Sequence, residues 1–179
     1  MNKFKEHIYK YGKWIGEGSS RCAFELKGKI YKIPYRPVGI IQSKNEMILY
    51  EKLKNNFFNL FPNPVFHENG VVEMDKVVMI DDISGFWCDN PIDIIIEKQL
   101  VSEKNLQNFF YFTEVAGKMN YSIDDLFYNG GNIGVLNDQI KIIDWGYTNS
   151  LKPSDYITTT LQYKKLQERL ELFTNKPTF

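Results

Sequence analysis

The chain has 179 residues, of which 43% are hydrophobic and 15% aromatic, so it can bury a core as one domain or two small lobes and is not a disordered chain. Its 22 basic and 22 acidic residues give zero formal net charge, without the basic excess of a nucleic-acid binder. Two cysteines, Cys22 and Cys88, and two histidines argue against a Cys-rich or His-rich zinc site.

Residues 1–14 are too charged for a signal peptide. The longest apolar runs, such as residues 92–96 with Asp93 inside, are far shorter than a membrane span. We therefore expect a soluble, cytoplasmic protein with neither a membrane nor a nucleic acid as its partner.

The first third of the chain has the pattern of an antiparallel sheet. Strand-like runs at Lys13–Gly16, Cys22–Leu26 and Lys29–Pro34 are separated by the turn sequences EGSS and KG. Glycines in the first turn would let the backbone approach a ligand closely, so that its N–H groups and the hydroxyls of Ser19 and Ser20 face phosphate oxygens. An ordinary hairpin turn is the alternative.

Lys32 lies within an apolar strand and shares a face with Ile30. A buried ammonium group needs an anionic partner, which can be a carboxylate or a phosphate. A lysine that reaches solvent from a strand edge needs none, and this alternative stays open.

A helix is predicted over Ile40–Asn55 and offers Glu46 as the partner of Lys32, with Glu51 as second choice. The sequence SKNE has the pattern of a capping box, which would make Glu46 part of the helix N-terminus. If the helix instead begins near Val38, Glu46 is interior and can reach Lys32. The residues expected on the inner face are Ile48, Leu49 and Leu53.

Residues 64–77 predict a strand pair with a turn at Asn69–Gly70. Beyond them the pattern becomes helical, so we expect a β-rich N-terminal lobe over residues 1–75 and a helical C-terminal lobe over 76–179. The helices expected there span Ser102–Lys118 and Thr159–Phe173.

Residues 128–146 predict a β-hairpin, with Asn132 just before its first arm and Asp144 just after its second. The ends of an antiparallel hairpin meet, so these two side chains should be neighbours. Carboxylate and amide oxygens suit Mg²⁺, which takes its other ligands from water and phosphates. A turn asparagine and a capping aspartate are the alternative.

In this order, the segments resemble the protein-kinase-like superfamily. IGEGSSRCAF resembles its glycine-rich loop, IYKI its lysine strand, VVEMDKV its hinge, and NIGV with IKIIDWG its catalytic-loop asparagine and DFG motif. The resemblance implies an α+β, bilobal kinase-like fold, with a small antiparallel sheet and one helix in the N-lobe and a reduced helical C-lobe. After Gly146 the sequence has no APE-like motif.

By the same resemblance, the protein is an ATP- and Mg²⁺-dependent phosphotransferase that acts on a hydroxyl of a protein or a small molecule. Lys32, held by Glu46, would bind the α- and β-phosphates of ATP. Asn132 and Asp144 would hold Mg²⁺. The residues implied around the rest of the nucleotide are Gly16, Glu17, Gly18, Ser19 and Ser20 over the phosphates, and Met74 and Asp75 beside adenine.

Besides the missing APE-like motif, the sequence departs from the superfamily pattern at two places. Arg21 stands where the third loop glycine is usual, which predicts a stiffer loop. The catalytic aspartate is expected five residues before Asn132, but Phe127 is there; we assign the base to Asp125, with Asp124 as the alternative, if Gly130 and Gly131 absorb two extra residues. A pseudokinase that binds a nucleotide or a partner without turnover is therefore the alternative function.

Overall fold

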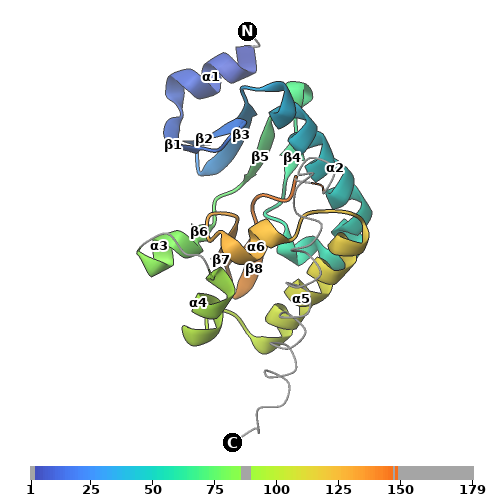
Figure 1. Ribbon diagram of the computed structural model, residues 1–179. Coiled ribbons are helices and arrows are strands. Elements are labelled where there is room, and N and C mark those ends of the chain that lie inside the picture. Colours follow the sequence, from blue (N-terminus) through green and yellow to red (C-terminus); the bar gives the residue numbers. More distant parts are fainter. Residues whose placement is uncertain (1–2, 86–89, 147, 149–179) are drawn as a thin grey trace, which may run out of the picture.

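The computed structural model of the protein describes residues 3–85, 90–146 and 148. Within these ranges it has a mixed α+β architecture, with an antiparallel sheet in the N-terminal half and mainly helices in the C-terminal half (Figure 1), which confirms the predicted class. Cys88 and the predicted helix over Thr159–Phe173 lie outside the described residues. None of the described helices combines the length and apolar character that crossing a membrane requires.

The larger sheet has five strands in the order β1-β2-β3-β5-β4, and each neighbouring pair is antiparallel. The three strands predicted before residue 35 are present, each within a residue of its expected bounds. A turn at Lys27–Gly28, both with positive φ, joins the second strand to the third. The strands are β1 (Lys13–Glu17), β2 (Arg21–Leu26), β3 (Lys29–Pro34), β4 (Val65–Phe66) and β5 (Val72–Asp75).

The strand pair β4–β5 forms as predicted. The short 3-10 turn η2 (Glu68–Gly70) joins its strands, with φ of 65° at Asn69 and 76° at Gly70. This left-handed backbone suits asparagine and glycine better than other residues.

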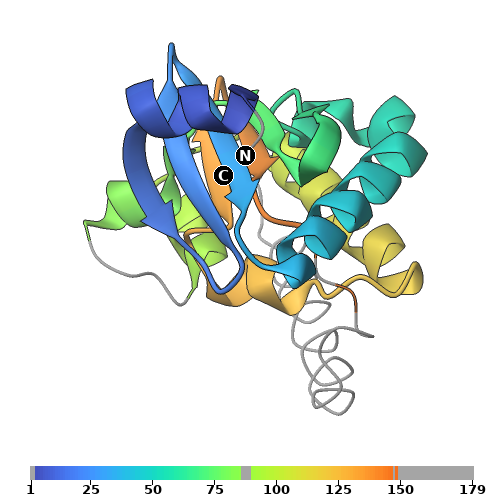
Figure 2. The same ribbon diagram turned by 90° about the horizontal axis from the view of Figure 1, so that it is seen from above.

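Helix α1 (Lys3–Tyr11) was not predicted, because its residues are mostly charged or aromatic. It lies across the larger sheet (Figure 2), and its Ile8 is fully buried. The small apolar cluster that forms beneath it consists of Ile8, Cys22, Phe24, Ile33 and Val71.

Helix α2 (Pro37–Phe57) begins earlier than the predicted Ile40. Pro37 stands in its first turn and Arg36 before it is extended, because proline suits a helix start and disfavours helical backbone in the preceding residue. The capping box predicted at SKNE is therefore wrong, and Glu46 is an interior residue. Ile48, predicted to face inward, is 43% exposed, whereas Leu49 and Leu53 are buried as expected.

The second half of the described chain surrounds a three-stranded antiparallel sheet in the order β6-β7-β8. Helix α5 confirms the helix predicted from Ser102, whereas α3, α4, α6 and β6 were not predicted. The elements are the 3-10 turn η1 (Phe58–Leu60), β6 (Val78–Met79), α3 (Ile80–Ser84), α4 (Pro91–Glu97), α5 (Glu103–Lys118), α6 (Asp124–Tyr128), β7 (Ile133–Leu136) and β8 (Gln139–Ile142).

The predicted hairpin is present in the expected register. Ile133 lies opposite Ile142 and Val135 opposite Ile140. Asn137 and Asp138 form its turn with φ of 52° and 60°, as in a type I′ turn. Asp138 also accepts a hydrogen bond of 2.7 Å from the Ser102 N–H, which anchors the turn beside the start of α5.

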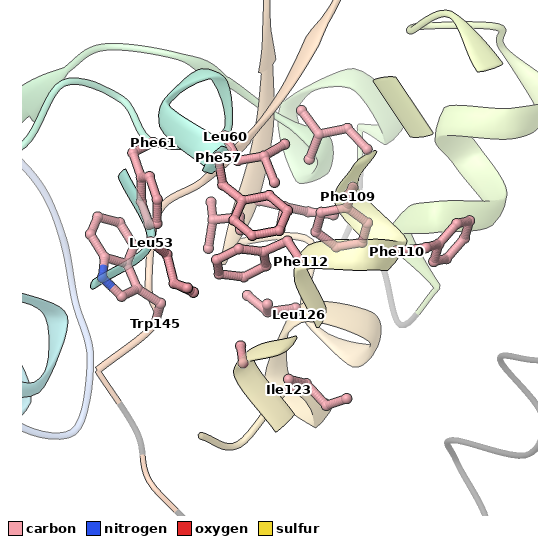
Figure 3. Packing of buried hydrophobic residues seen from close by; sticks show 14 of the residues in the cluster. Leu53, Phe57, Leu60, Phe61, Phe109, Phe110, Phe112, Ile123, Leu126 and Trp145 are labelled. Atoms are coloured by element: carbon pink, nitrogen blue, oxygen red, sulfur yellow. The ribbon is translucent and has the colours of Figure 1, made fainter. Parts of the chain in front are cut away.

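The main hydrophobic core joins the two halves of the chain (Figure 3). Aromatic rings at the end of α2 and directly after η1 meet Phe112 of α5. The Phe57 and Phe112 ring centroids are 5.5 Å apart, and those of Phe61 and Phe112 are 5.7 Å apart. Val72 and Met74 of the larger sheet belong to the same cluster. The two lobes predicted to meet at residue 75 therefore share one core, and the division between them stays a prediction.

Candidate active site

A cleft of about 550 Å³ lies between the turn after β1, strand β3, the segment after β5 and the end of the β7–β8 hairpin. It brings together most of the predicted site residues; Glu46 lies outside its lining. The predicted residues that line it are Gly16, Glu17, Gly18, Ser19, Ser20, Lys32, Met74, Asp75, Asn132 and Asp144.

Lys32 is buried and has the anionic partner that its position requires. Its Nζ lies 2.5 Å from Glu46 Oε1 and donates a second hydrogen bond, of 2.8 Å, to the Ile143 carbonyl. Burial and the nearby Arg21 lower the pKa of Lys32, although two carboxylates oppose this shift. Glu51, the second choice, instead pairs with exposed Lys54.

Glu46 is fully buried because it is an interior residue of α2 that faces β3. Its carboxylate also meets Arg21: Oε1 accepts a 2.9 Å hydrogen bond from Nη2, and Oε2 forms a 2.9 Å ion pair with Nη1 that lacks hydrogen-bond geometry. One carboxylate thus serves two buried cations.

Arg21 is a site residue whose role the sequence did not predict. The side chain is only 5% exposed, and its Nη2 lies 2.7 Å from Asp144 Oδ1, across 123 residues of sequence. The replacement of the third loop glycine was visible in the sequence, but it indicated only a stiffer loop. The structure places a positive charge between the α2 glutamate and the aspartate after β8.

Asp144 lies in the cleft with its side chain 28% exposed. Burial alone would raise the pKa of this carboxyl, but the charges of Arg21 and Lys32 outweigh it and hold the pKa below its usual range. Asp144 is therefore ionised at neutral pH, as a metal ligand or a charge partner must be.

Trp145 and Gly146, the two residues after Asp144, form hydrogen bonds that hold the segment after β8 against α2. Trp145 Nε1 donates a 2.9 Å hydrogen bond to the Glu46 carbonyl, and Asn45 Nδ2 donates one of 3.1 Å to the Gly146 carbonyl. A Cβ on Gly146 would lie 2.5 Å from the Gln42 carbonyl oxygen, so only glycine fits there. The position of Asp144 thus depends on α2.

The ends of the hairpin meet as predicted. The Asn132 carbonyl accepts hydrogen bonds from the N–H groups of Ile143, at 2.7 Å, and Asp144, at 3.4 Å. The described residues contain no cluster of three His, Cys, Asp or Glu side chains that could hold a metal. One carboxylate and one amide are oxygen donors of the kind that Mg²⁺ prefers and need no such cluster, so the magnesium site stays a prediction for this pair.

The glycine turn is fixed by hydrogen bonds to the backbone of Gly18. The Gly18 N–H donates to the Arg21 carbonyl at 2.9 Å, and the Tyr35 hydroxyl donates to the Gly18 carbonyl at 2.5 Å. Ser20 is 2% exposed and its hydroxyl donates to the Gln42 side chain. This differs from the expectation that the Ser20 hydroxyl faces phosphate, because α2 packs directly against the turn.

Asp75 is the last residue of β5, and its side chain binds neighbouring residues of the protein. The carboxylate accepts hydrogen bonds of 2.5 Å from Lys29 and 2.6 Å from Asn63, and the bond from Lys29 lowers its pKa. The Asp75 N–H donates to the Pro62 carbonyl at 2.8 Å. The predicted contact of this segment with adenine thus stays a prediction for the backbone that lines the cleft after β5.

Asp125 lies in the first turn of α6, a helix that was not predicted, and its side chain is outside the described part of the structure. Phe127, which stands at the expected position of the base, stacks on Phe110 at 6.5 Å and is a packing residue. Asn129 and Asp82, which were not predicted as site residues, are among the polar residues that line the cleft.

No family model matches the sequence, and no curated protein does. Two solved structures are similar to the chain, each over 80% of this chain and 70% of the other, at 14% identity. One is the crystal structure of the aminoglycoside phosphotransferase APH(2'')-Ib, ADP-bound, with a TM-score of 0.46. The other is the streptomycin-ATP-APH(2")-IIa ternary complex, with a TM-score of 0.44.

Proposed function

We propose that the protein is an ATP- and Mg²⁺-dependent phosphotransferase that moves the γ-phosphoryl group of ATP to a hydroxyl of a protein or a small molecule. The observation that carries this proposal is the buried ion pair of Lys32 and Glu46, which lies at a cleft that also contains Asp144. Burying a charged pair is costly, and a sheet does not need one for its stability. A phosphate-binding role supplies the reason to keep it.

In this function, Lys32 binds phosphate oxygens of ATP while Glu46 fixes the position of its ammonium group. The backbone from Gly16 to Gly18 lies over the phosphates, and the segment after β5 contacts adenine. Asn132 and Asp144 hold Mg²⁺, which when bound would neutralise charge on the phosphates. Asp125, or else Asp124, takes the proton from the attacking hydroxyl.

These assignments agree with what phosphoryl transfer requires. The reaction depends on aligned groups and on fixed positive charge around the transferred phosphoryl group more than on covalent help. Lys32 is fixed by two contacts, to Glu46 and to the Ile143 carbonyl. We propose the cytoplasm, where ATP is available, as its location.

One experiment combines ATP binding and turnover. ATP at about 100 times its Kd would stabilise the protein by about 2.7 kcal/mol, which for a domain of this size raises Tm by roughly 5–11 °C. We expect this shift with Mg²⁺, a weaker shift in Asp144→Asn, and loss of ATP turnover in Asp144→Asn, Lys32→Ala and Asp125→Asn. Lys54→Ala, which removes the lysine of an exposed ion pair on α2, is the matched control and should keep both.

The outcomes separate two functions. If the native protein shows no ATP binding with or without Mg²⁺, the phosphotransferase proposal fails. Binding without turnover would favour a nucleotide-binding or partner-binding module, for which the pairing of Asp144 with Arg21 is the supporting observation. Full turnover in Asp125→Asn would move the base to another residue, with Asp124 tested next.

A further inference from the structure

Arg21 forms an ion pair with Asp144, the aspartate that is proposed to hold Mg²⁺. Its Nη2 is shared between Glu46 Oε1 at 2.9 Å and Asp144 Oδ1 at 2.7 Å, and Nη1 lies 3.5 Å from the Ser43 hydroxyl. The guanidinium group is almost completely buried, so water weakens these contacts little. In this arrangement the negative charge of Asp144 is neutralised by the protein itself.

The charges around Asp144 are balanced without a metal ion. Two cations, Lys32 and Arg21, face two anions, Glu46 and Asp144. A divalent cation bound at Asp144 would lie beside the guanidinium group, where like charges repel strongly in a partly buried site. Metal binding therefore needs either displacement of Arg21 or a further source of negative charge.

We infer that Arg21 acts as the resident counter-ion of Asp144, so that the divalent cation enters the site with the nucleotide and not before it. The phosphates of a nucleotide bring the missing negative charge and offer the guanidinium group new acceptors, which releases Asp144 to the metal. The inference rests on the proposed function in that it takes Asp144 to be a metal ligand.

Arg21 is well placed for such an exchange of partners. It is the first residue of β2, directly follows the turn proposed to lie over the phosphates, and lines the same cleft as Asp144. Its backbone is held independently, by the Gly18 N–H and by the pairing of Arg21 with Pro34. The guanidinium group can thus change partners without moving the strand.

The test measures Mn²⁺ binding to the full chain without nucleotide, by electron paramagnetic resonance. We expect weak binding to the native protein and binding tighter by about tenfold or more in Arg21→Gln, since removing one charge-assisted contact changes affinity by that order. Arg21→Lys should bind Mn²⁺ weakly because it keeps the charge. Arg36→Gln, which changes an exposed arginine beside Tyr35, is the matched control and should behave like the native protein.

Equal Mn²⁺ affinity in Arg21→Gln and the native protein, within twofold, would overturn the inference and leave Arg21 a structural ion pair only. The gain must also disappear in Arg21→Gln combined with Asp144→Asn; a gain that persists would place the metal elsewhere. If Arg21→Gln does not fold, as judged by circular dichroism, Arg21→Gly removes the same charge and takes its place.

Mn²⁺ binding to Asp144→Asn, in which Arg21 is unchanged, is a second test of the inference. Asp144→Asn should alter Mn²⁺ affinity less than twofold when nucleotide is absent, and a tenfold loss would refute the inference. Titration with a non-hydrolysable ATP analogue then reports separately on the proposed function. Failure to bind the analogue would remove the phosphotransferase proposal, whereas the Mn²⁺ data alone still decide what Arg21 does to Asp144.

Discussion

Replacement of Glu46 by glutamine tests whether the buried charges act as one network. Glutamine has nearly the same shape as glutamate but lacks its charge, so packing against β3 is kept. The change leaves Lys32 and Arg21 buried, with Asp144 as the remaining carboxylate that the structure shows in contact with Arg21.

The magnitude follows from the burial of these groups. Glu46 is fully buried and Arg21 is 5% exposed, so a cation that loses its partner cannot recover its hydration. Breaking a buried pair by removing one partner typically costs about 3–5 kcal/mol. For a chain of this length, this loss lowers Tm by roughly 6–20 °C.

The assay is urea and thermal unfolding followed by circular dichroism, with Glu51→Gln as the matched control on the same helix. Glu51 is exposed and pairs with Lys54, so its replacement should change the unfolding free energy by less than about 0.5 kcal/mol. Adding Lys32→Met to Glu46→Gln should recover about 1 kcal/mol or more, because one unpaired cation is removed.

Two results would refute this reasoning. One is a loss below about 1 kcal/mol in Glu46→Gln, which would mean that water or movement of the side chains compensates the lost charge. The other is additivity of the Glu46 and Lys32 changes, which would mean that the two residues do not interact in the folded protein.

Two further predictions concern the segment after β8. Gly146→Ala should lower the unfolding free energy by about 1–3 kcal/mol, because the added Cβ would lie 2.5 Å from the Gln42 carbonyl oxygen. The control in the same denaturation assay is Gly16→Ala, whose added carbon would have no atom within 4 Å. The lowered pKa of Asp144 contributes stability above the unfolded value of about 3.9 that is lost as pH falls. Unfolding free energies measured from pH 7 downward should therefore show the gap between native protein and Asp144→Asn narrowing below about pH 4; a constant gap would contradict the assigned shift.

Local patterns predicted several elements because their causes are local. The turns at Lys27–Gly28 and Asn69–Gly70 need left-handed backbone, which glycine and asparagine adopt at low cost, so the flanking strands follow from the sequence. Alternation of apolar residues fixed the register of the β7–β8 hairpin. The start of α2 was predictable in principle from Pro37, but the SKNE pattern offered a competing start.

Other elements depend on contacts that no local pattern encodes. Helix α1 has a mostly polar sequence and is stabilised by burying Ile8 on the sheet. Helix α6 is one short turn, too short to be stable without its neighbours, and its Phe127 packs against Phe109 and Phe110.

By itself, the sequence determined that Asn132 and Asp144 close one hairpin, because strand alternation and hairpin geometry act within a few residues. For Lys32 it offered an anionic partner or a solvent-facing strand edge and did not decide between them. Only the tertiary structure decided which groups meet in the cleft. Arg21 joins Glu46, 25 residues away, to Asp144, 123 residues away, through contacts that exist only when α2 and the segment after β8 pack beside the start of β2. Ion pairs between residues so far apart leave no periodic pattern in the sequence. Only the folded structure therefore shows that Asp144, the proposed metal ligand, is paired with Arg21.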